Sequence, residues 1–322
     1  MMPRLKTDAG KASLLRRVRR QRLKYITILP SLITILNGAF GFTAIIFAGK
    51  GSGMLSTSSR IPFFTFESST YFAMSGYMIL VAMVADMLDG RIARRVQSTS
   101  SFGGQLDSLC DVISFGVAPA FLMLNVLEHE LALIGLADES FLLRFIWLSA
   151  TAYISCAAIR LARFNVENEE DESAHMSFMG LPAPAAAGVI VSLIIFHQET
   201  LPAFAIICIL PFLALGISIL MVSRIRYPHV LNQYLRGKKP FAYLIRVLLL
   251  IAFVFVTSIP VALVLIFCGF AAGSFVRWLY YRVLTSRAVA RLRHKIGPEQ
   301  NDLVPAAQHS ASVAIDQEQV EK

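Results

Sequence analysis

Long apolar runs separated by short polar or charged connections set the pattern of this 322-residue chain. Eight runs approach the roughly 20 apolar residues that a helix needs to cross a membrane. Their approximate bounds are 30–48, 71–88, 103–126, 142–162, 180–197, 201–222, 241–258 and 259–281. The pattern therefore predicts an all-α polytopic membrane protein of about eight transmembrane helices, a six-helix core followed by two C-terminal helices.

Basic residues gather at one set of helix ends. They fill the segment 1–25, the positions 91–95 after the second run and the loop 224–239. Because cytoplasmic loops carry an excess of Lys and Arg, these ends are expected on the cytoplasmic side. Eight spans then put both termini in the cytoplasm of a multi-pass protein of the cell (inner) membrane.

The same pattern divides the chain into four parts. Residues 1–25 form a basic cytoplasmic segment, and 26–240 form the membrane domain with the six-helix core. Residues 241–284 are expected to add a transmembrane hairpin. Residues 285–322 turn polar and acidic, and we expect them to be a disordered cytoplasmic tail.

Composition agrees with a membrane protein. Hydrophobic residues make up 56% of the chain and charged residues 16%, against about 25% charged in soluble domains. The net charge of +9 is concentrated in tails and connections, which suits an anionic lipid surface better than nucleic acid. The four cysteines stand singly in apolar runs and indicate small buried side chains, not disulfides or a zinc site.

Four aspartates close together stand out from this apolar background. Asp86 and Asp89 end the second run, and Asp107 and Asp111 begin the third. On helices the members of each pair share a face, so two helices meeting at a hinge would bring all four carboxylates together. Such a cluster calls for a hard divalent cation. N-capping is an alternative for Asp107, but not for Asp86 and Asp89, which the helix dipole disfavours at a C-terminal end.

The spacing of these residues carries a family resemblance. It reads D-x2-D-G-x2-A-R-x8-G-x3-D-x3-D, and its fixed positions are Asp86, Asp89, Gly90, Ala93, Arg94, Gly103, Asp107 and Asp111. The signature resembles that of the CDP-alcohol phosphatidyltransferases, a family of integral membrane enzymes in which an alcohol attacks the β-phosphorus of a CDP-linked substrate and releases CMP.

The resemblance implies a role for each matching residue. Asp86, Asp89, Asp107 and Asp111 would bind Mg2+ or Mn2+, as a pair of ions, and Asp111 would also act as the general base on the acceptor hydroxyl. The CDP moiety would lie against the small and basic positions of the signature, which are Gly90, Ala93, Arg94 and Gly103. The family likeness also implies a homodimer.

Three further stretches are similar to the bacterial phosphatidylserine synthases of that family. They lie around residues 29–42, 160–166 and 180–187. They imply CDP-diacylglycerol as donor and L-serine as acceptor, with membrane lipids as surroundings.

Polar residues in two of these stretches are candidates for the substrate pocket. Arg160, Arg163 and Asn165 could hold the carboxylate of the amino acid, although positive-inside anchoring is the alternative for the two arginines. Asn37 lies in the middle of the first run and serves either helix packing or the site.

Two other readings remain open from the sequence. One keeps the chemistry and changes the acceptor to glycerol 3-phosphate, inositol phosphate or choline. The other is a cation transporter that uses intramembrane carboxylates, although transporters typically show repeated, Gly/Pro-broken helices at the membrane midplane.

Overall fold

The apolar runs in the described part of the chain form helices in the computed structural model of this protein. The structure describes residues 31–52, 71–96, 101–135, 140–170, 180–201, 204–223 and 258–273, with residues 276 and 280. The helices are Ser31–Gly51, α2 (Tyr71–Val96), α3 (Ser101–Asp111), the π-helix η1 (Val112–Val117), α4 (Ala118–Leu133), α5 (Ser140–Glu170), α6 (Ala183–Glu199), α7 (Phe204–Val222) and Ile259–Gly273. None of the described residues lies in a strand.

Five of the helical segments are long and apolar enough to cross a membrane, and α6 and Ile259–Gly273 are shorter apolar helices. The segment from α3 through η1 to α4 counts as one of the five. A helix satisfies its own backbone hydrogen bonds, which is why such apolar runs fold this way in lipid. The prediction of an all-α polytopic membrane protein is confirmed.

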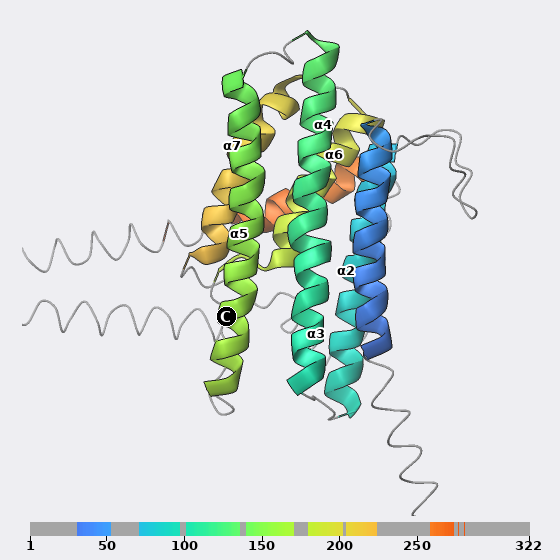
Figure 1. Cartoon of the computed structure of the whole chain (residues 1–322), viewed down its shortest axis with the longest axis vertical. Helices are drawn as coiled ribbons and strands as arrows, with labels where there is room; N and C mark the ends of the chain where they lie inside the picture. Colours follow the sequence, from blue (N-terminus) through green and yellow to red (C-terminus); the bar gives the residue numbers. More distant parts are fainter. Residues whose placement is uncertain are drawn as a thin grey trace, which may run out of the picture.

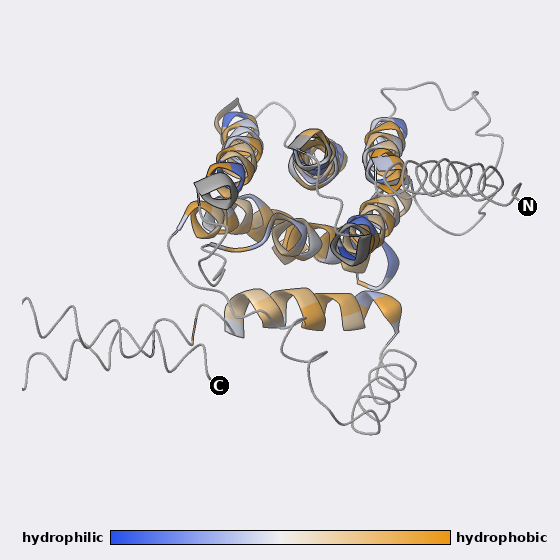
Figure 2. Ribbon diagram, turned by 90° about the horizontal axis from the view of Figure 1, so that it is seen from below, coloured by the Kyte–Doolittle hydropathy of each residue, from blue (hydrophilic) through white to orange (hydrophobic). Residues whose placement is uncertain are grey.

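The long helices run side by side along the vertical axis of the molecule (Figure 1). Viewed along that axis, Ser31–Gly51, α4 and α5 form one row and α2, α6 and α7 form a second row behind it (Figure 2). The core lies between the rows and includes Phe115, Leu122, Tyr153 and Ile190, none of which is measurably exposed.

The Ile259–Gly273 helix lies across the back of the second row, transverse to the other helices (Figure 2). Its Phe267 packs on α6 at Gly188, where an added Cβ would overlap the aromatic ring. This helix lies within the expected eighth span, 259–281, and the membership of that span in a transmembrane hairpin stays a prediction. A glycine opposite a large ring explains how the crossing helix packs so closely.

Several helices continue beyond the apolar runs that predict them. α2 extends to Val96, past the predicted end near Leu88, and α5 extends to Glu170, past residue 162. The added turns carry polar and basic residues, and a helix can continue into the aqueous boundary because its hydrogen bonds are internal. The expected seventh span, the 1–25 segment and the 285–322 tail lie outside the described residues.

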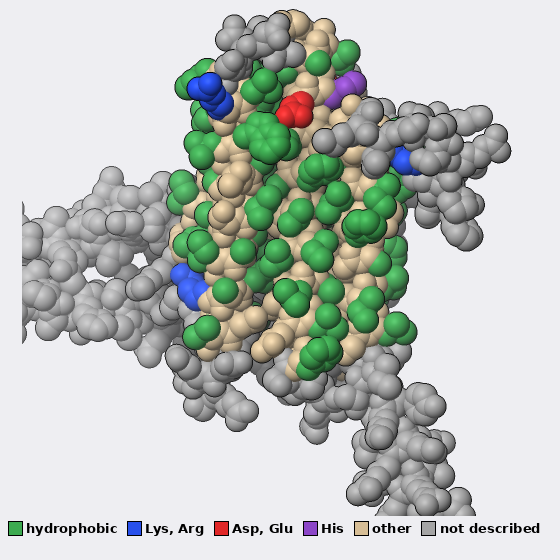
Figure 3. Space-filling view, viewed as in Figure 1, with side chains coloured by type: hydrophobic (Ala, Val, Ile, Leu, Met, Phe, Trp, Pro, Cys, Tyr) green, Lys and Arg blue, Asp and Glu red, His purple; other side chains and the backbone are tan. Residues whose placement is uncertain are grey.

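The outer surface agrees with a lipid environment. Hydrophobic side chains cover the full height of the face in Figure 3, and acidic and His side chains lie near its upper end. Leu148, Phe212 and Ile219 are each at least 60% exposed. Such a band of apolar side chains is stable against lipid and unfavourable against water.

Candidate functional site

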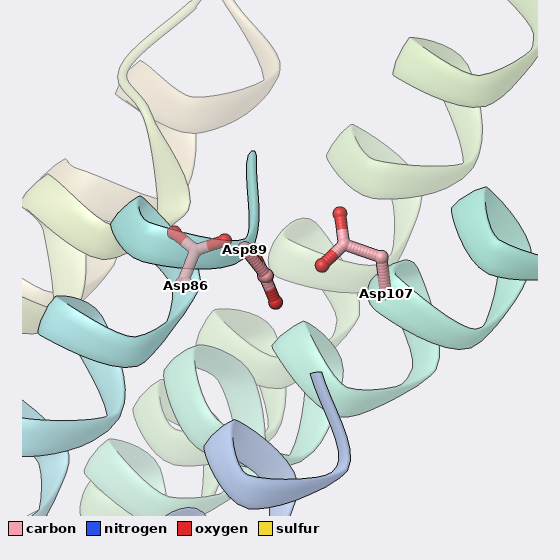
Figure 4. Close-up of side chains that lie close together, drawn as sticks. All are labelled: Asp86, Asp89 and Asp107. Carbon is pink, nitrogen blue, oxygen red and sulfur yellow. The ribbon is translucent and has the colours of Figure 1, made fainter. Parts of the chain in front are cut away.

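α2 and α3 bring three of the four predicted aspartates together at the lower end of the bundle. Asp86 and Asp89 come from α2 and Asp107 comes from α3, and their carboxyl groups face a common space (Figure 4). One carboxylate oxygen of each lies within 4.8 Å of those of the other two. This is the spacing at which several oxygens can bind the same cation.

The surroundings of these carboxylates leave oxygens available inside the protein. Asp89 is 4% exposed and accepts hydrogen bonds from the Thr34 hydroxyl and the Gly90 backbone N–H. Its Oδ2 atom and Oδ1 of Asp107 are buried, with no hydrogen-bond partner among the described residues. Buried carboxylate oxygens without partners are costly, and hard divalent cations prefer such ligands. The donor set therefore fits a divalent cation.

Asp111 lies next to this cluster but is not one of the three. It is 8% exposed, and the side-chain amide Nδ2 of Asn37 donates a 2.9 Å hydrogen bond to its Oδ1 atom. Asp86 and Asp107 act on it electrostatically. The predicted share of Asp111 in metal binding stays a prediction, whereas its position beside the cluster suits a group that receives a proton.

Small residues let the first helix approach closely enough for this contact. A Cβ added at Gly38 would come within 3.0 Å of the Cys110 sulfur, and one added at Gly41 would overlap Ser114. Small residues allow such close approach of membrane helices. Because the first helix packs this closely against α3 and η1, the Asn37 side chain reaches Asp111. Asn37 therefore lies beside the aspartates.

A buried arginine faces the aspartates from α5. Arg160 is 7% exposed and interacts electrostatically with Asp111 and Asp86. Its Nε atom is buried without a hydrogen-bond partner in the described part of the chain. One guanidinium cannot neutralise four carboxylates, so the site still favours added cations. The orphaned Nε is a donor that an anionic group could use.

The two other candidates on α5 already contact neighbouring helices. Arg163 donates from Nη1 to the backbone oxygen of Val222 at the end of α7, at 3.3 Å. Asn165 accepts a 2.9 Å hydrogen bond at Oδ1 from the hydroxyl of Ser108, the residue after Asp107. Both residues therefore join helices at the end of the bundle where the aspartates lie.

The predicted CDP-binding positions are described in part. A Cβ added at Gly90 would meet no atom of the described residues within 4 Å, so among these residues the space beside this backbone is open. Gly103 is half-buried near the start of α3. The side chains of Ala93 and Arg94 lie outside the described residues, although their backbone belongs to α2.

Comparison with known proteins settles the family. The model of the CDP-alcohol phosphatidyltransferase family matches residues 27–218, which include all four aspartates. The chain belongs to this family. It is therefore a transferase, and the resemblance seen in the aspartate signature is confirmed.

Relatives within the phosphatidyltransferase family share a serine-related name. The CDP-diacylglycerol–serine O-phosphatidyltransferase of Helicobacter pylori is 33% identical over 221 residues, covering 68% of this chain and 85% of the relative. The enzyme of that name from Methanocaldococcus jannaschii is 35% identical over 200 residues, covering 62% and 83%. The archaetidylserine synthase of Methanothermobacter thermautotrophicus is 32% identical over 206 residues, covering 63% and 70%.

Sequence reasoning missed two polar residues at this phosphatidyltransferase site. Thr34 donates to Asp89, and Ser108 joins α3 to Asn165. Thr34 has a signal in the sequence, because it precedes Asn37 by three positions and therefore shares its helix face. Ser108 has none, since its partner comes from a distant helix.

Proposed function

We propose that this phosphatidyltransferase makes phosphatidylserine and CMP from CDP-diacylglycerol and L-serine. The observation that carries the proposal is the three-aspartate cluster with Asp111 beside it, held by Asn37 and facing Arg160. This arrangement offers a cation site, a proton acceptor and a buried cationic donor within one small volume. The serine-related names of the relatives support the choice of acceptor.

Asp86, Asp89 and Asp107 would hold Mg2+ or Mn2+, with Asp111 sharing in a two-ion site. When bound, a divalent cation neutralises charge on the oxygens of the diphosphate. The two orphaned carboxylate oxygens of Asp89 and Asp107 support this assignment.

The diphosphate of CDP-diacylglycerol would lie beside α2 and α3. Gly90 offers open space for the nucleotide to approach the backbone, and Gly103, Ala93 and Arg94 complete the proposed CDP pocket. Where an added Cβ would meet no described atom, a glycine leaves room for a ligand that a side chain would fill.

Asp111 would take the proton of the serine hydroxyl. A new bond then forms between that oxygen and the β-phosphorus, and the bond from the β-phosphorus to the bridging oxygen breaks. CMP leaves with the bridging oxygen. An ordinary aspartate is a weak base, with a pKa of about 3.9, so position and not basicity is what this residue must supply.

Arg160 is the proposed partner of the serine carboxylate. Its buried Nε has no hydrogen-bond partner among the described residues, and a guanidinium binds a carboxylate in a defined geometry. Arg163 and Asn165 would shape the same pocket through their contacts with α7 and α3. Positive-inside anchoring also suits Arg163.

We further propose that the aspartate end of the bundle faces the cytoplasm, that both termini lie there, and that the enzyme works as a homodimer in the inner membrane. The basic residues in the last turns of α2 support the orientation, since positions 91, 94 and 95 are all arginine.

The test supplies membranes containing the protein with CDP-diacylglycerol, Mg2+ or Mn2+, and one labelled alcohol at a time. We expect CMP release and labelled phosphatidylserine with L-serine. Membranes with the Asp111→Asn protein are the matched control. Product with glycerol 3-phosphate, inositol phosphate or choline but none with serine would overturn the choice of acceptor.

A further inference from the structure

The helix that carries Asp107 and Asp111 changes its hydrogen-bond register directly after Asp111. Residues Val112–Val117 form a π-helical turn inside the continuous helical segment Ser101–Leu133. The Ala118 N–H donates to the Ile113 carbonyl, five positions back. Single π-turns inside α-helices are rare and occur frequently at functional sites. The wider hydrogen-bond spacing of a π-turn therefore needs stabilising contacts from neighbouring helices.

Pro119 and Tyr153 determine the hydrogen bonding of the Phe115 carbonyl in this turn. The Phe115 carbonyl cannot accept an N–H from four positions ahead, because that residue is Pro119 and has none. The buried hydroxyl of Tyr153, on α5, donates to the Phe115 oxygen at 3.0 Å instead. An unpaired carbonyl at membrane depth is unfavourable, because lipid offers no hydrogen-bond donor. Tyr153 therefore supplies a hydrogen bond in place of the α-helical one that Pro119 cannot make.

The helix Ser31–Gly51 contacts the π-turn on the side away from α5. The Ser114 hydroxyl donates to the Asn37 backbone oxygen at 3.0 Å, and the amide of that residue in turn donates to Asp111. Close to Ser114, a Cβ added at Gly116 would be in ordinary contact with Ala157 of α5, at 3.5 Å, so the turn also lies against α5. The π-turn is thus fixed between Ser31–Gly51 and α5.

We propose that Tyr153 is a positioning residue for the transfer reaction, an inference that rests on the proposed function. By holding the Phe115 carbonyl, which Pro119 leaves without an α-helical donor, it fixes the geometry of the π-turn and so sets the rotation of α3 relative to α4. α4 is anchored in the core by Leu122, Met123 and Leu127. Loss of the Tyr153 hydroxyl would leave this carbonyl without its donor, because Pro119 cannot replace it, and a shift of the turn would displace Asp107 and Asp111 relative to α2.

The first test replaces Tyr153 by Phe, which removes the hydroxyl and keeps the ring. Tyr77→Phe is the matched control, because its hydroxyl also makes a hydrogen bond, to Glu199 at 2.7 Å, at the opposite end of the bundle. We expect kcat for CMP release to fall on the order of tenfold in Tyr153→Phe, since small displacements of catalytic groups are costly. KM for CDP-diacylglycerol should change by less than about twofold, as expected when only the transition state is affected. A kcat equal to that of Tyr77→Phe would overturn the proposal.

A second variant separates positioning from simple stabilisation. Adding Pro119→Ala to Tyr153→Phe returns an N–H to the Phe115 carbonyl, so the thermal midpoint should recover towards that of the wild type. The kcat should stay low, because the turn can now close into an α-helix. This double variant also covers the case in which Tyr153→Phe does not fold. Recovery of kcat together with stability would show that Tyr153 serves stability alone and would overturn the proposal.

Backbone hydrogen exchange tests the turn independently of the acceptor. Tyr153→Phe should exchange faster over residues 112–120 than Tyr77→Phe does. Absence of CMP release by the wild-type protein with every alcohol would end the proposed function, and exchange would still judge the turn. Unchanged exchange in Tyr153→Phe would overturn this inference whatever the enzyme transfers.

Discussion

Asn37 donates a 2.9 Å hydrogen bond from its side-chain amide to the carboxylate of Asp111, across 74 positions of the sequence. Both residues are buried, and Oδ1 of Asn37 has no hydrogen-bond partner among the described residues. A carboxylate held at one oxygen has a fixed direction, because the hydrogen bond restricts rotation of the side chain. The first helix is therefore part of the site and not only a membrane anchor.

Replacing Asn37 by Ala should lower kcat for CMP release by about tenfold to a hundredfold, the range of a hydrogen bond to a charged group. Asn125→Ala is the matched control, because Asn125 is also buried and donates within its own helix, to the Phe121 oxygen. Steady-state kinetics of both purified variants provide the measurement. Equal kcat values in the two variants would contradict a role for Asn37 at the site.

Asp111→Asn should leave the protein folded and able to bind CDP-diacylglycerol while CMP release falls by about 10²–10⁴-fold, the usual contribution of a general base. The substitution removes the proton acceptor and keeps the shape of the side chain. Binding of CDP-diacylglycerol and turnover are measured on the same preparation. Turnover retained at the wild-type rate would exclude Asp111 as the base.

Removal of divalent cations with EDTA should abolish CMP release, and Mg2+ or Mn2+ should restore it. Asp89→Asn should weaken Mn2+ binding at least about tenfold in an electron paramagnetic resonance titration, because it removes a charged oxygen ligand. Glu130→Gln is the control, since this carboxylate lies 3.3 Å from the His197 ring nitrogen Nε2 and accepts a hydrogen bond from Gln198 at the opposite end of the bundle. Mn2+ binding unaffected by Asp89→Asn would reject the assigned metal site.

Gly90→Ala should raise KM for CDP-diacylglycerol about tenfold, the scale of one misplaced methyl group in a pocket. The thermal midpoint should not fall, because the added Cβ meets no atom within 4 Å. An unchanged KM would place the nucleotide elsewhere.

Gly41→Ala adds the same methyl group as Gly90→Ala, but at a crowded position. Its Cβ would come within 2.7 Å of the Ser114 backbone, so the first helix would have to shift. We expect a loss of about 1–3 kcal/mol in stability, as overpacking costs. Gly216→Ala is the control, since its Cβ would meet nothing within 4 Å. Equal melting temperatures for the two variants would contradict the close packing described.

The sequence by itself determined the membrane helices, because length and apolarity are local properties that any helix in lipid must have. It also determined the pairing of Asp86 with Asp89, since residues three apart on a helix share a face. The signature around them identified the family. Asp107 could likewise be assigned to the cluster, because only a short connection separates α2 from α3.

Only the tertiary structure decided which distant residues complete the site. Asn37, Arg160 and Tyr153 come from helices whose separation along the chain carries no information about their contacts. The sequence also did not predict the π-turn, although Pro119 lacks the N–H that the Phe115 carbonyl would bind in an α-helix. Helix rotation and close approach depend on how small and large side chains pack across an interface. The direction of a side chain within the site is therefore set by packing between helices, whereas the existence of each helix is set by its own residues.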